Sequence, residues 1–174
     1  MSSRATYASD TPLTVALRDA LPAGALAAVL SGVPSTTYTL ATGGDLREGA
    51  LAAGSILLPC EQRPWRLLAA AVPVHLALSF GWAAVLAAAL PRRRTVPAAV
   101  AGALGIAALD LEVIGRRFPR VRALPQPPQW ADHVAYGLAV GVVVRTRRRR
   151  RAAQAGAATP ALAQASARST ARVS

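Results

Sequence analysis

The chain has 174 residues, of which 53% are hydrophobic and 16% are charged, and its formal net charge is +12. Soluble domains carry about 25% charged residues. Here the charges stand outside a few long apolar blocks, so the composition excludes an ordinary soluble domain and indicates an integral membrane protein. The sequence has no lysine and no asparagine, which we interpret as genomic bias towards GC. The positions of the arginines are therefore more informative about function than their number. The single cysteine, Cys60, excludes an intramolecular disulfide and a cysteine-based metal site.

The N-terminal region, residues 1–19, is predicted to be a polar segment with a short helix over residues 12–20. Acidic residues precede the first apolar run, which is not typical of a secretory signal, so we expect this run to remain as a membrane anchor. The first span is predicted over residues 20–42, with a bend at Pro34. Backbone groups freed by the bend need partners within the protein. Candidate partners are Ser31, Ser35, Thr36 and Thr37.

The next element is predicted to be a short interfacial or re-entrant helix over residues 45–58. It is too short for a full span, which needs ~20 residues. The second span, residues 67–90, is the clearest because it contains no formal charge. A basic turn at residues 91–94 joins it to the third span, residues 95–115, and so short a connection predicts that these two spans are antiparallel neighbours.

The fourth span is predicted over residues 127–146, where the apolar stretch is short. Residues 145–174 form a basic tail without an apolar face, which predicts disorder. The membrane domain is therefore expected over residues 20–144. The sequence predicts an all-α fold: a polytopic membrane helix bundle with four transmembrane helices, one short interfacial or re-entrant helix and a disordered basic C-terminal tail.

The distribution of arginine predicts the orientation of this bundle. The N-terminal segment, the 91–94 turn and the tail together hold 13 of the 20 arginines, and the loops on the other side hold 7. Arginine and lysine near the spans favour the cytoplasmic side. We therefore expect a multi-pass protein of the cell membrane with both termini in the cytoplasm.

Asp110 is the most informative polar residue, because a carboxylate inside a bilayer costs about 2.5–3.5 kcal/mol and must face protein or water. In an antiparallel bundle, late residues of the first and third spans meet early residues of the second and fourth. We therefore predict that His75, Asp110 and His133 project into one protein-lined space. The alternative is that these polar residues only satisfy hydrogen bonds near span ends. The predicted intramembrane cluster consists of His75, Ser79, Asp110, Asp132, His133 and Tyr136.

Two further patterns indicate contacts rather than chemistry. Gly137 and Gly141 form a GxxxG-type face, which lets a neighbouring helix approach closely. The arginine run after the fourth span is expected to contact anionic lipid headgroups. Nucleic acid is a less favoured partner, because no aromatic residue interleaves the run. The residues of this run are Arg147, Arg148, Arg149, Arg150 and Arg151.

Two stretches, SGVPSTTYTLATGGD (31–45) and LDLEVIGRRFPRVRALPQPPQWADHVAYG (109–137), resemble small polytopic membrane proteins of high-GC bacteria. The resemblance implies a membrane helix bundle. It implies no activity, so no functional residue is carried over from it.

No catalytic template is found in the sequence, which lacks a P-loop and an HExxH motif. We therefore expect no enzymatic activity, no cofactor and no metal. We interpret the chain as a small accessory or partner-binding membrane protein, or as a homo-oligomer. The first alternative is a small transporter or channel with Asp110 or His75 as its ionisable element. The second is a membrane enzyme or metal site. A polar cavity reaching past the middle of the bilayer would favour transport, whereas an alanine-packed interior would favour the accessory role.

Overall fold

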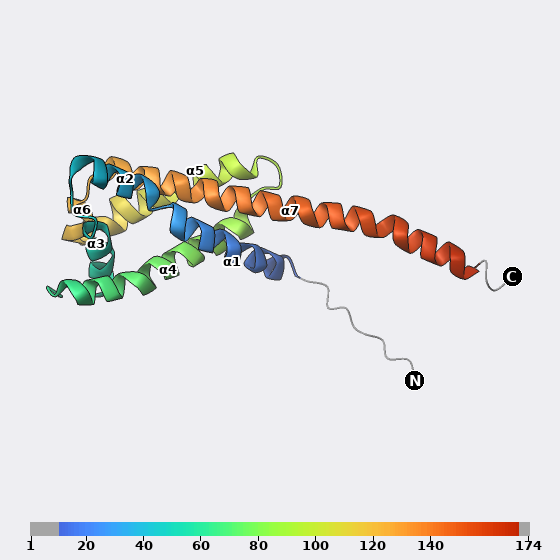
Figure 1. The fold of residues 1–174 in the computed structure, drawn as a ribbon, viewed down its shortest axis with the longest axis horizontal. Coiled ribbons are helices and arrows are strands. Elements are labelled where there is room, and N and C mark those ends of the chain that lie inside the picture. The colour runs from blue at the N-terminus through green and yellow to red at the C-terminus, as the bar shows by residue number, and fades with distance from the viewer. Residues whose placement is uncertain (1–10, 171–174) are drawn as a thin grey trace, which may run out of the picture.

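Helices make up the whole architecture (Figure 1), as the sequence predicts. The computed structural model describes residues 11–170, with the backbone alone for residue 12 and residues 158–170, and no β-strand occurs in this range. Most of the predicted N-terminal polar segment and the last four residues of the tail lie outside it. The elements are α1 (Pro12–Leu30), α2 (Val33–Thr42), α3 (Glu48–Leu57), α4 (Pro64–Ala89), α5 (Thr95–Ala107), the π-helical η1 (Ala108–Ile114), the 3-10 turn η2 (Gly115–Arg117), α6 (Pro119–Ala123) and α7 (Gln126–Thr170).

Three segments of the described chain are long and apolar enough to cross a membrane: Leu13–Thr42, Pro64–Ala89 and Thr95–Arg117. They coincide with the first three predicted spans. The first of them contains the predicted short helix as well, because α1 runs without interruption from Pro12. The predicted short helix over residues 45–58 corresponds to α3.

The first span is broken at Ser31 and Gly32, between α1 and α2, directly before Pro34, where the sequence predicts a bend. Pro34 lies in the first turn of α2. Its missing N–H is no loss there, because the first N–H groups of a helix have no partner within the helix. The break therefore precedes the proline, and the proline begins the new helix.

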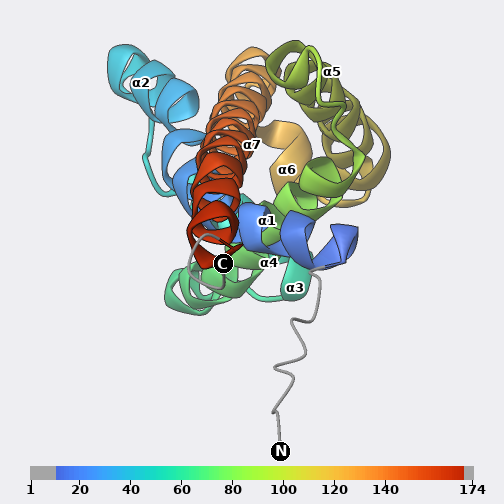
Figure 2. The ribbon, with the colours of Figure 1, turned by 90° about the vertical axis from the view of Figure 1, so that its right-hand side faces the viewer.

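Helices α4 and α5 meet near the turn that joins them, where a Cβ atom on Gly102 would lie 2.8 Å from the Leu86 Cδ2 atom, and they diverge further from it. The prediction that they pack as neighbours therefore holds only near the turn. Helix α5 packs along α7, whereas α4 packs against α1 and α3 (Figures 1 and 2). The two glycines of the GxxxG pattern explain why α5 packs along α7. A Cβ atom on Gly137 would lie 2.7 Å from the Ala103 Cβ, and one on Gly141 would lie 2.9 Å from the Ala99 Cβ. Only glycine allows α7 to lie this close to α5.

The bundle has two different ends. We call the end that holds the start of α1, the 91–94 turn and Arg147–Arg151 the basic end, since side-chain hydrogen bonds join these three segments. We call the other end the capped end, because α3 crosses it (Figure 1) and packs on α4 and α6. The interior between the middle of the bundle and the basic end is packed mainly by buried alanines: Ala16, Ala20, Ala23, Ala27, Ala83, Ala87, Ala99 and Ala103.

Helix α7 continues to Thr170, so the predicted disorder of the tail from residue 145 is not confirmed. Alanine, arginine and glutamine are strong helix formers and dominate this stretch. Its first turns are also held by contacts of Arg147, Arg148 and Arg151 with α1 and the end of α4. Beyond these contacts, α7 extends past the rest of the bundle (Figure 1).

Candidate functional site

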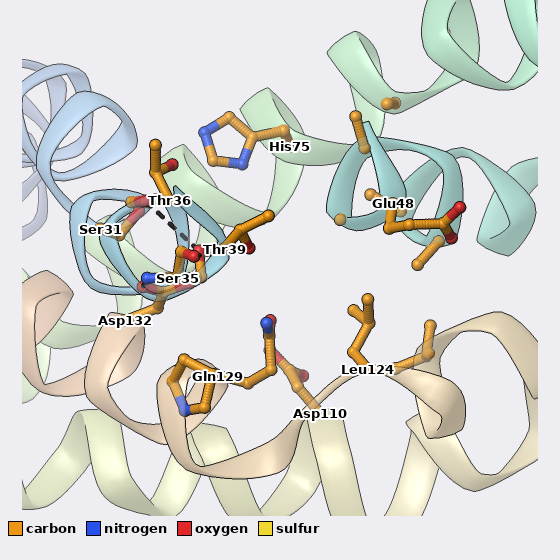
Figure 3. A pocket seen from close by; sticks show the side chains of 18 of the residues that line it. Ser31, Ser35, Thr36, Thr39, Glu48, His75, Asp110, Leu124, Gln129 and Asp132 are labelled. Carbon is orange, nitrogen blue, oxygen red and sulfur yellow. Dashed lines mark hydrogen bonds between the residues drawn. The ribbon is translucent and has the colours of Figure 1, made fainter. Parts of the chain in front are cut away.

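A cavity of about 700 Å³ lies at the capped end, between α2, α3, α4, η1, α6 and α7. The helices α4 and α5 diverge towards this end (Figure 1), and side chains from α2, α3, α4, η1 and α7 line the space between them (Figure 3). The lining residues that lie nearest to the basic end are Ser31, Trp82, Ile106 and Tyr136. The alanine-packed interior begins between these residues and the basic end. The cavity therefore reaches from the capped end to about the middle of the bundle and stops there.

All six residues of the predicted polar cluster line this cavity. They come from three helical segments that are far apart in the sequence: His75 and Ser79 from α4, Asp110 from η1, and the others from α7. Their roles differ, as the contacts below show.

Asp110 and His133 face each other, with 3.7 Å between Oδ2 of the carboxylate and Nε2 of the ring. The Nδ1 atom of His133 lies 2.8 Å from the Gln129 carbonyl oxygen, which can only accept, so Nδ1 carries a hydrogen. Nε2 and the carboxylate oxygen are then both acceptors unless one proton lies between them.

The backbone around Asp110 departs from the α-helix. Asp110 lies in the π-helical segment η1, and its carbonyl accepts the N–H of Gly115. A Cβ atom on Gly115 would lie 2.7 Å from that carbonyl oxygen, so glycine is what permits the close approach. Single π-helical turns within helices are found frequently at functional sites. Here the wider turn presents the Asp110 side chain to the cavity.

His75 and Asp132 satisfy backbone groups at the break between α1 and α2. The Nε2 atom of His75 lies 2.9 Å from the carbonyl oxygen of Ala28, in the last turn of α1. The carboxylate of Asp132 accepts the N–H of Ser35, in the first turn of α2, at 2.9 Å. Helix ends leave such groups without partners, and a carboxylate at a helix N-terminus is also favoured by the helix dipole. Both residues therefore have a structural role that the sequence analysis attributed to serine and threonine alone.

Two aromatic residues form the deep end of the cavity. The Tyr136 hydroxyl donates to the Ser79 carbonyl oxygen at 2.5 Å and ties α7 to α4. The indole Nε1 of Trp82 is buried and has no hydrogen-bond partner within the described residues. An unsatisfied buried donor costs about 1–3 kcal/mol, so an acceptor on a bound molecule would gain by reaching it.

The charges on the wall are unusual for so basic a chain. Four acidic residues line the cavity, and none of the arginines that the structure describes does: the four are Asp45, Glu48, Asp110 and Asp132. Asp45 is paired with Arg47, whose side-chain hydrogen bonds lower the pKa of Asp45 to about 2. Other acids, such as Glu61 and Glu112, also pair with arginine. Glu48, Asp110 and Asp132 have no ion pair with any described arginine, and all three lie on this wall.

The sequence analysis missed the strongest polar contact at the basic end. Asp19 is only 2% exposed, and its carboxylate accepts from Arg147 Nε at 2.8 Å and from both terminal nitrogens of Arg151 at 2.5 and 2.6 Å. Arg148 donates to the carbonyl oxygens of Ala87 and Leu90 at the end of α4. The antiparallel argument that groups the six cavity residues would also have placed Asp19 beside Arg147, had it been applied to this end. Arg147, Arg148 and Arg151 thus bond within the protein, and the headgroup contact of the run stays a prediction.

Within residues 11–170, no three side chains among His, Cys, Asp and Glu lie close enough together to hold a metal ion. The site is thus defined by its own geometry: an apolar cavity with acids on its wall. Comparison of the chain with protein-family models, with curated proteins and with solved structures found no match.

Proposed function

We propose that this chain is a small multi-pass membrane protein that binds an amphipathic, positively charged small molecule in the cavity at the capped end. The observation that carries the proposal is the lining of the cavity: it is mostly apolar, it bears acids without arginine partners, and none of the described arginines reaches it. Ligand sites are typically apolar clefts of about 300–1,000 Å³ with a few placed polar groups. The volume of about 700 Å³ lies within that range.

The chemistry favours an organic cation over a bare ion. Apolar side chains such as Val72, Leu76 and Ile106 offer an apolar ligand body a surface to bury. A carboxylate away from bulk water attracts a positive charge more strongly than an exposed one does. An inorganic cation would lose its hydration without gaining this apolar contact. The unsatisfied Trp82 N–H gives the ligand a third point of recognition.

The proposed ligand agrees best with the transporter alternative, with Asp110 as the ionisable element. The accessory or homo-oligomeric role remains the second candidate, because the interior towards the basic end is packed by alanine as that role requires. The GxxxG face gives it no support, since Gly137 and Gly141 are used against α5. Light scattering of the purified protein in detergent tests this candidate, since a stable oligomer or a co-purifying subunit would favour it.

We propose that α7 supplies a fourth span over residues 127–146 and that both termini are cytoplasmic. Two facts support this: the three arginine-rich segments of the basic end lie together, and positive charge near spans favours the cytoplasm. Reporter fusions after Arg94 and after Arg151 should both report the cytoplasm, and a fusion after Gln126 should report the outside. A cytoplasmic signal at Gln126 would contradict the four-span arrangement.

The proposed binding can be tested with tetraphenylphosphonium, a rigid apolar cation, by equilibrium dialysis against the purified protein in detergent. We expect saturable binding that the Asp110→Asn variant weakens by about tenfold or more, equivalent to about 1.4 kcal/mol. The physical reason is that asparagine keeps the shape and an acceptor but removes the negative charge beside the cavity.

The matched control is Glu112→Gln, which removes the same charge two residues further along η1. Glu112 is exposed, pairs with Arg116 and does not line the cavity, so its loss should leave binding unchanged. Tetraphenylsilane, a neutral molecule of similar shape, should bind much more weakly than the cation. Equal binding of both molecules would refute the charge selectivity, and no saturable binding would refute the ligand class.

A further inference from the structure

A second cleft, of about 350 Å³, lies between α1 and α7 at the basic end. It is unrelated to the cavity described above, which lies at the capped end. Four arginines line it, with no acidic residue among its lining residues: Val15, Arg18, Arg147, Arg150, Arg151 and Gln154.

Asp19 fixes two arginines of this cleft, Arg147 and Arg151, in position. It bonds to Arg147 only through Nε, whereas it holds Arg151 through both terminal nitrogens. Within the described residues, the two terminal nitrogens of Arg147 have no hydrogen-bond partner and can donate to a ligand. The hydrogen bonds to Asp19 raise the pKa of Arg151, so this side chain keeps its charge. Against Arg147, Arg150 and Arg151, the single carboxylate of Asp19 leaves a surplus of two positive charges at the cleft.

Arg150 has a different position. No hydrogen bond or ion pair joins it to another residue within the described part of the chain, yet it lines the same cleft. Guanidinium groups match the geometry of phosphate oxygens with paired N–H donors. A cleft with preset guanidinium donors and a surplus of positive charge is suited to a phosphate group.

We propose that this cleft binds a phosphate group that carries more than one negative charge, with Arg147, Arg150 and Arg151 from α7 as its donors. The proposal separates these residues from the rest of the arginine run. Arg148 bonds to carbonyl oxygens at the end of α4, and Arg149 is exposed and does not line the cleft.

Two sources can supply such a phosphate: a lipid headgroup or a free phosphate ion. The cleft lies where α7 passes from its apolar stretch to its arginine run, and the exposed side chains of Leu13 and Leu17 lie on the same region of α1. An acyl chain could therefore lie along α1 while the headgroup occupies the cleft. The shared chemistry is the phosphate, and the experiment distinguishes the sources.

The test measures binding of the purified full chain to vesicles of phosphatidylcholine with and without phosphatidic acid, a lipid with a phosphate monoester. Arg150→Gln should weaken binding to the phosphatidic acid vesicles by about tenfold, the effect of losing one charge-assisted contact. Arg149→Gln, which removes the same charge from the neighbouring residue, should weaken it less than twofold. Neither side chain supports the fold, so both variants are expected to remain folded.

Millimolar inorganic phosphate is then added as a competitor. Competition would support the site with free phosphate as its source, and binding that phosphate does not displace would support it with the lipid as its source. Equal losses for Arg149→Gln and Arg150→Gln would overturn the proposal, because they would show attraction by the whole arginine run without a discrete site. Equal binding to vesicles with and without phosphatidic acid would overturn it as well.

Discussion

Replacing Gly54 by alanine is expected to have the largest effect on stability of any small substitution in the chain. In α3, a Cβ atom at Gly54 would lie 1.9 Å from the carbonyl oxygen of Leu67 and 2.6 Å from its carbonyl carbon. These are backbone atoms at the start of α4, and Leu67 is fully buried, so neither helix can yield without moving as a whole. Overpacking of this kind costs about 1–3 kcal/mol and sometimes more. We expect about 3 kcal/mol here, and a fall of roughly 5–10 °C in the midpoint of thermal unfolding.

The matched control is Gly49→Ala, five residues earlier in the same helix. A Cβ atom at Gly49 would meet no atom within 4 Å. Gly49 lies in the first turn of α3, where alanine gains less over glycine than in a helix interior, so this variant should be about as stable as the native protein. If the two variants unfolded at the same temperature in detergent, the close packing of α3 on α4 would be wrong. The cavity would then lack the cover that α3 provides.

The second large effect is expected for Asp19→Asn. This substitution removes the charge that holds Arg147 and Arg151 against α1 and leaves a buried amide beside two guanidinium groups. Hydrogen bonds to charged groups contribute about 1.5–3 kcal/mol each. Both arginines are partly exposed, at 41% and 38%, and can turn towards solvent, so the loss is smaller than the sum. We expect a destabilisation of about 2 kcal/mol, measured by thermal unfolding, with looser contact of α7 on α1.

Asp45→Asn provides the comparison for this prediction. Asp45 also accepts hydrogen bonds from two nitrogens of one arginine, Arg47, but both side chains are exposed and the two residues are two positions apart in the sequence. Exposed local ion pairs contribute little to stability. The Asp45 variant should therefore unfold at the native midpoint. A similar midpoint for the Asp19 variant would show that the buried ion pairs do not hold α7 to the bundle.

The helices and the grouping of polar residues could be predicted from the sequence because both depend on local patterns. Long apolar runs define the first three spans, and antiparallel order brings Asp110 and His133 to one place at one depth. The hydrogen-bond partners at the break in the first span could not be predicted in this way. They come from other helices, since His75 and Asp132 bond to the backbone groups at the ends of α1 and α2.

The cavity itself could not be predicted, because it arises from a choice between packing partners. The short turn at residues 91–94 favours contact of α4 with α5. However, Gly137 and Gly141 let α7 approach α5 closely, so α5 packs mainly along α7. The contacts of Arg147, Arg148 and Arg151 could not be predicted either, since composition shows the absence of an apolar face but not these contacts. Those contacts depend on Asp19, whose burial becomes evident only when α1 and α7 are placed side by side.

The central claim, that the cavity selects positive charge, can be tested on its wall through the adjacent residues Thr36 and Thr37. Both are exposed residues of α2, but only Thr36 lines the cavity. Each is replaced by cysteine in a Cys60→Ser background, and the rates of modification by a cationic and an anionic methanethiosulfonate are compared. We predict that the cationic reagent is favoured several-fold more at position 36 than at position 37, and that Asp110→Asn reduces this difference. The same ratio of rates at both positions would contradict a cation-selective cavity.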